Sequence, residues 1–84
     1  MIVVDTNTIA YLLIPGERSQ HARKALERDA DWAAPRLWRS EFRNILALYL
    51  RQSLLSLDQA LRLIHEAELL MRGGEYEVGS IQVL

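Results

Sequence analysis

The chain has 84 residues, half of them hydrophobic, with ten basic and eleven acidic side chains and a formal net charge of −1. This composition excludes a disordered tail, the lack of cysteine excludes a disulfide scaffold, a zinc ribbon and thiol catalysis, and the length allows one domain at most. No apolar run approaches the roughly 20 residues that span a bilayer, and the N-terminus lacks the pattern of a secretion signal, so we expect a cytoplasmic protein with no membrane partner.

The first half of the chain alternates short apolar runs with helical patterns. Residues 2–4 are a continuous apolar run that ends at Asp5, which predicts a strand buried on both faces. Residues 9–14 and 19–29 are predicted helices. Residues 31–34 are a weaker second strand.

The second half begins with the clearest helical pattern, over residues 37–52. Its aromatic residues Trp38, Phe42 and Tyr49 recur at helical spacing, which favours a core or an interface over a platform for stacked bases.

A further helix is predicted to begin after Ser56, because Ser56 and Gln59 have the spacing of a capping box. Gly73 and Gly74 end it. Its expected buried stripe consists of Leu57, Ala60, Leu61, Ile64 and Met71. Residues 76–84 are predicted to form a third strand.

The order of these elements is strand, helix pair, strand, helix pair, strand. This order predicts an α/β fold in which a short parallel sheet is flanked by helices and the crossovers are right-handed. A sheet of three strands leaves edges that more chain or a partner must cover, and the apolar ending at Val83 and Leu84 indicates a fold incomplete at its C-terminus.

Asp5 is the first candidate site residue. Ligands of open parallel sheets bind beyond the carboxyl ends of the strands, and Asp5 follows the first strand there. The alternative is that Asp5 or Thr6 caps the helix that follows, since both residue types are favoured caps.

Glu41 is the second candidate. Its neighbours three and four residues away include no basic side chain, so it has no ion pair along its own helix. It is expected at the border of the apolar face of that helix. A metal, a cation from another element or water would satisfy it, and the alternative is a glutamate at the solvated rim. Asp5 and Glu41 together are suited to a hard divalent cation such as Mg²⁺.

These residues carry a resemblance to a known family. The strand that ends in Asp5-Thr6-Asn7, followed by Pro35, Glu41 and Asn44 at their spacing, resembles the N-terminal part of a PIN domain. The chain is most similar to toxin nucleases of the VapC type, and the resemblance covers residues 1–84 as a partial domain.

The resemblance implies a three-layer PIN-like fold and an endoribonuclease that depends on Mg²⁺ or Mn²⁺. By motif position Asp5 and Glu41 are the first two acidic ligands, catalytic and metal-binding, while Asn7 and Thr6 support the site. The later acidic positions of the family lie beyond the third strand, past the last residue here, so we expect the 84-residue chain by itself to be inactive or impaired as an enzyme. Glu75 and Glu77 are expected at the end of the sheet opposite Asp5, so neither glutamate replaces the missing acidic positions.

Two further readings stay open. The chain is alternatively a non-catalytic module for dimerisation or for binding an antitoxin, or a piece of a longer nuclease. Its expected partners are RNA, a second copy of itself and an antitoxin protein. Arg36, Arg39 and Arg43 share one side of a helix, which fits RNA phosphates, a solvated face or an antitoxin contact.

Overall fold

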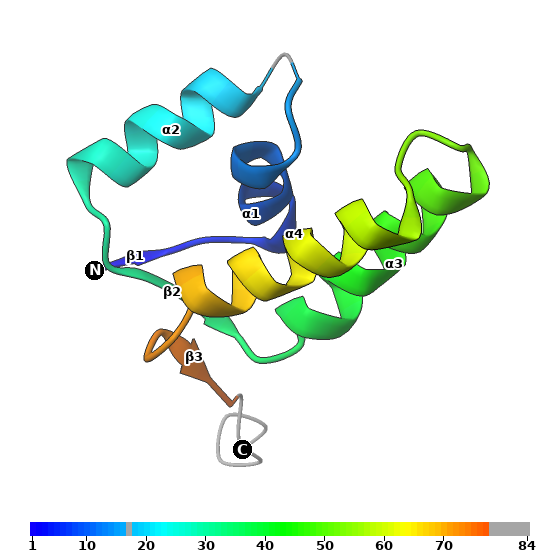
Figure 1. The fold of residues 1–84 in the computed structure, drawn as a ribbon. Helices are drawn as coiled ribbons and strands as arrows, with labels where there is room; N and C mark the ends of the chain where they lie inside the picture. The colour runs from blue at the N-terminus through cyan, green and yellow to red at the C-terminus, as the bar shows by residue number, and fades with distance from the viewer. Residues whose placement is uncertain (17, 78–84) are drawn as a thin grey trace.

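The computed structural model describes residues 1–16 and 18–77 and has an α/β fold (Figure 1). Its elements in chain order are β1 (Ile2–Val3), α1 (Thr6–Leu13), α2 (Ser19–Arg28), β2 (Trp32–Pro35), α3 (Trp38–Arg51), α4 (Leu57–Leu70) and β3 (Glu75–Tyr76). The predicted class, a small parallel sheet with helices, is therefore confirmed. None of the described helices is both long and apolar enough to cross a membrane.

The sheet has the order β1-β2-β3, and both neighbouring pairs are parallel. The backbone N–H of Val4 donates to Ala33 O at 2.8 Å, which extends the pairing of β1 and β2 up to the residue before Asp5. Asp5 therefore lies at the carboxyl end of the sheet, as the sequence predicted.

Helix α1 begins at Thr6, earlier than the predicted start at Ile9. The reason is local: Asp5 is in an extended conformation at the N-cap, and its side chain accepts a hydrogen bond from the backbone N–H of Thr8. Residues 6–8 are consequently the first turn of a helix and not a loop. The side chain of Asn7 is presented from that turn.

Helices α3 and α4 form an antiparallel pair that lies beside α1 (Figure 1). The predicted capping box of α4 is present, with Ser56 and Gln59 each accepting a hydrogen bond from the backbone of the other. The core shared by sheet and helices includes Ile9, Trp32, Ala34, Trp38, Phe42, Leu46, Ala60, Ala67 and Met71.

The predicted stripe of α4 is wrong at two positions. Leu57 and Leu61 are 63% and 55% exposed, whereas Ala60, Ala67 and Met71 are buried. The small side chains of Ala60 and Ala67 allow close packing of α4 on its neighbours, and this rotates the larger leucines outward.

Strand β3 also differs from its predicted position. It begins at Glu75, and its register places Glu75 opposite Ala34 and Tyr76 opposite Pro35, at the carboxyl end of β2. Gly74 sets this register, because a Cβ there would overlap with Trp32 O. The expectation that Glu75 lies at the end of the sheet opposite Asp5 is therefore wrong. Residues 78–84 of the predicted third strand lie outside the described residues.

Candidate functional site

Asp5 presents a carboxylate at the end of β1 that Thr8 holds in place. Its Oδ1 accepts hydrogen bonds from Thr8 N at 2.8 Å and from Thr8 Oγ1 at 2.7 Å. These bonds, that of the Thr8 hydroxyl foremost, hold the pKa of Asp5 below its ordinary value, so the exposed carboxylate is ionised at neutral pH. The capping alternative is thus confirmed, and the same geometry fixes the direction in which the charge is presented.

Glu41 reaches the same region from the first turn of α3. Its Oε1 accepts a hydrogen bond of 2.8 Å from Thr6 Oγ1, and Thr6 is 8% exposed. The partner that Glu41 lacks along its own helix is therefore a hydroxyl contributed 35 residues earlier in the chain. Since Thr6 follows Asp5 directly, this bond ties Glu41 to the same end of the sheet as Asp5.

Both carboxylates line one cavity of about 910 Å³, here named the carboxylate hollow. The amides of Asn7 and Asn44 line it as well. Its other walls are largely apolar and include Val3, Val4, Pro35, Trp38, Ile45 and Tyr76. The polar side chains offer oxygen donors and include no thiolate or imidazole, and this donor set fits Mg²⁺ or Mn²⁺ better than a softer metal.

The structure brings together the four residues that the sequence singled out: Asp5, Glu41, Asn7 and Thr6. Within residues 1–16 and 18–77, however, no three histidine, cysteine, aspartate or glutamate side chains are close enough to hold an ion by themselves. A cation at this hollow would accordingly keep several waters or take ligands from substrate, as Mg²⁺ commonly does.

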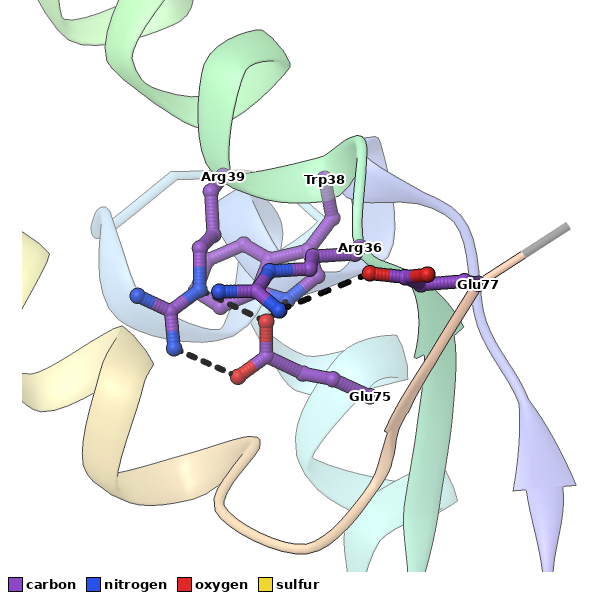
Figure 2. Close-up of polar contacts among 5 residues, drawn as sticks. All are labelled: Arg36, Trp38, Arg39, Glu75 and Glu77. Carbon is purple, nitrogen blue, oxygen red and sulfur yellow. Dashed lines mark hydrogen bonds and ion pairs between the residues drawn. The ribbon is translucent and has the colours of Figure 1, made fainter.

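Glu75 does not line the carboxylate hollow and instead pairs with Arg39 (Figure 2). Its two carboxylate oxygens accept hydrogen bonds from Arg39 Nε and Nη2, both at 2.6 Å, and one of them also accepts from Trp38 Nε1 at 3.2 Å. Arg39 lowers the pKa of Glu75 below its ordinary value. The sequence did not predict this bidentate pair, because it joins α3 to β3 across 36 positions.

Arg36 has an acidic partner too, but a looser one. Its Nη1 lies 3.6 Å from Glu77 Oε1, and both side chains are well exposed (Figure 2). Two of the three arginines considered for RNA contact thus face glutamates of the β3 region. This arrangement favours a structural role for Arg39 and leaves Arg36 in a weak surface pair.

Three residues of the site were not singled out as site residues from the sequence. Thr8 orients Asp5, and its position three residues after a cap was the available signal. Asn44 lies one helical turn after Glu41 on the same side of α3. Tyr76 reaches the hollow through the register of β3, which no local pattern specified.

A scan of the chain against protein-family models finds no match. A search among curated proteins also finds no match.

Proposed function

We propose that the chain is a PIN-like domain and that its carboxylate hollow is the divalent-metal site of an endoribonuclease. The observation that carries the proposal is the hydrogen bond of 2.8 Å from Thr6 to Glu41, which fixes Glu41 in the cavity that Asp5 also lines at the carboxyl end of the sheet. These are the two acidic positions that the Asp-Thr-Asn and Pro…Glu…Asn motifs of PIN domains share with this sequence. The three-layer form of the family is part of the same proposal.

In this proposal Asp5 and Glu41 hold Mg²⁺ or Mn²⁺. The chemistry that such an ion supplies in phosphodiester hydrolysis is activation of a water and neutralisation of charge on the phosphate. Thr8 keeps Asp5 ionised and fixed, and Thr6 positions Glu41. Asn7 supports the site from the first turn of α1, and the exposure of both carboxylates leaves room for a phosphate.

The first test measures metal binding. Mn²⁺ is titrated calorimetrically into the wild type, Asp5→Asn, Glu41→Gln and the control Glu66→Gln, which removes an exposed carboxylate of α4. We expect each site variant to bind at least about tenfold more weakly, while the control binds like the wild type. Equal binding by all four proteins would reject the metal site.

The second test measures cleavage of single-stranded RNA. We expect only weak cleavage, dependent on Mn²⁺ and abolished by EDTA and by Asp5→Asn, because two carboxylates line the hollow among the described residues. Metal binding without any cleavage would support the metal site, reject the nuclease activity of this chain and favour the non-catalytic module described next.

The second candidate is a non-catalytic module for dimerisation or antitoxin binding. The observation that favours it is an exposed apolar surface on α4, where Leu57 and Leu61 lie one turn apart and are 63% and 55% exposed. Light scattering of the wild type and of Leu57→Ser/Leu61→Ser is its test. A concentration-dependent dimer that the double variant dissociates would support it, whereas a monomer in both cases would reject self-association.

A further inference from the structure

A second cavity of about 330 Å³ adjoins the carboxylate hollow. Asn7 and Ile45 line both cavities, so these two residues mark the place where the cavities adjoin. We name the second cavity the tyrosine hollow, after Tyr11 and Tyr49 in its walls. Its volume falls within the range of small-ligand pockets, about 300–1,000 Å³.

Among the described residues, Arg18 supplies a positive charge to one wall of the tyrosine hollow. The guanidinium carbon of Arg18 lies 5.4 Å from the centroid of the Tyr11 ring, a cation–π contact that orients the charged group. Arg18 also directly precedes α2, whose N-terminal N–H groups carry the positive end of the helix dipole. An anion such as a phosphate is therefore the favoured ligand at this wall.

Another wall is aromatic. Tyr49 lies on α3, one turn after Ile45, and is half-buried, in contrast to the buried Trp38 and Phe42 of the same helix. The sequence grouped these three aromatic residues together as core or interface, but only Tyr49 lines the tyrosine hollow. Arg18 contacts the ring of Tyr11 and not that of Tyr49, but both tyrosines line the same cavity as Arg18. Accessible aromatic rings and a cationic group in one cavity are the combination with which proteins bind unpaired bases.

We propose that the tyrosine hollow is a nucleotide subsite that binds single-stranded RNA next to the phosphate held at the carboxylate hollow. A base stacks on Tyr49, the adjoining phosphate pairs with Arg18, and the amide of Asn7 makes hydrogen bonds where the two cavities meet. This subsite rests on the proposed nuclease function, because it is the carboxylate hollow that defines the neighbouring phosphate.

The test is the binding of a fluorescein-labelled single-stranded RNA hexamer, followed by anisotropy with Ca²⁺ in place of Mn²⁺, so that the carboxylate hollow can hold a cation while cleavage is suppressed. We expect Tyr49→Leu to weaken binding roughly 5- to 100-fold, the range for loss of one stacked base, and Tyr49→Phe to retain it. Arg18→Gln should reduce the slope of log affinity against log salt by about 0.7, and Arg62→Gln on α4 should leave it unchanged. Melting curves check that each variant is folded.

The outcomes separate this subsite from the proposed nuclease. Equal affinity for wild type and Tyr49→Leu, or no binding by the wild type, overturns the subsite even where Asp5 still binds Mn²⁺. Dependence on Tyr49 and Arg18 without any Mn²⁺ binding supports the subsite and rejects the nuclease. An equal loss in Tyr49→Phe and Tyr49→Leu would assign the effect to the hydroxyl and overturn the stacking.

Discussion

The start of α3 lies beside two glutamates that accept hydrogen bonds from different partners. One is Glu41 of α3 itself, and the other is Glu75 of β3. Glu75 receives a bidentate pair from Arg39 and a further hydrogen bond from Trp38, and its side chain is 17% exposed. Glu41 is exposed and receives one hydrogen bond from the neutral hydroxyl of Thr6. The charge of Glu75 is therefore neutralised inside the protein, whereas Glu41 has no ion pair among the described residues.

The difference separates a structural carboxylate from a candidate functional one. An arginine in a fork geometry satisfies both oxygens of a carboxylate and locks it in place. A hydroxyl fixes one oxygen and leaves most of the negative field intact. Substitutions at the Glu75 region should accordingly lower stability, and those at the Glu41 region should lower metal affinity.

The largest effect on stability is expected from Gly74→Ala, which acts on the Glu75 region. The added Cβ would overlap with the carbonyl oxygen of Trp32, a backbone atom that cannot move without separating β2 from β3. We expect the free energy of unfolding to fall by about 3 kcal/mol, the upper end of the usual range for overpacking. Thermal denaturation followed by circular dichroism measures it.

The matched control is Gly16→Ala. The nearest atom to a Cβ at Gly16 is Ile14 O at 4.0 Å, an ordinary contact, so the melting temperature should barely change. A melting temperature for Gly74→Ala equal to that of the control would show that β3 is not packed on β2 as described.

Glu75→Gln should have the next largest effect. The variant keeps the shape of the side chain but leaves the Arg39 guanidinium without its counter-charge. We expect a loss of about 1.5–3 kcal/mol in the free energy of unfolding, the range for hydrogen bonds to charged groups. Glu77→Gln is the control, because its contact with Arg36 is long and exposed and should contribute little.

The same pair predicts a dependence on pH. The folded pKa of Glu75 is lowered by Arg39 from an ordinary value of 4.5, so its contribution is complete above pH 4.5 and is lost as pH falls through the folded pKa. The difference in stability between wild type and Glu75→Gln should therefore be constant at neutral pH and shrink in acid. Urea denaturation across this range measures it, and a difference that grows in acid would contradict the ion pair.

Thr6→Val tests the other glutamate with a smaller effect on stability. It removes the buried hydroxyl while preserving the branched shape, which should cost about 1 kcal/mol. Because Glu41 then loses the group that positions it, affinity for Mn²⁺ should fall by about tenfold. Thr6→Ser keeps the hydroxyl and should retain most of the affinity, and an equal loss in both variants would exclude positioning by the hydrogen bond.

Local features were predictable from the sequence. The capping box of Ser56 and Gln59 and the place of Asp5 at the end of β1 depend on residues within a few positions of each other. The alternation of strands and helix pairs likewise sufficed to predict a parallel sheet. The capping box and the place of Asp5 depend on backbone geometry that a short segment specifies alone, whereas the parallel sheet follows from the order of the elements along the chain.

Features that join distant segments were not predictable in the same way. Leu57 and Ala60 both fit the apolar stripe predicted for α4. Only the packing of α4 against its neighbours determines that Ala60 is buried and Leu57 is exposed. The hydroxyl partner of Glu41 and the arginine partner of Glu75 each come from about 35 positions away. The sequence therefore identified the carboxylates of Glu41 and Glu75, but it did not predict the hydrogen-bond partners that distinguish the two.

The smallest effect on stability is expected from Asp5→Asn, and it separates the two roles of Asp5. Asparagine is as good an N-cap as aspartate, so its side-chain oxygen can still accept from Thr8 and the free energy of unfolding should change by less than about 0.5 kcal/mol. Asp5→Ala removes the cap and should cost about 1 kcal/mol. Both variants lack the charge, so both should lose Mn²⁺ affinity to a similar extent. If affinity instead follows stability, falling in Asp5→Ala and persisting in Asp5→Asn, then Asp5 acts through the helix it caps, and only Glu41 remains as a charge for the cation.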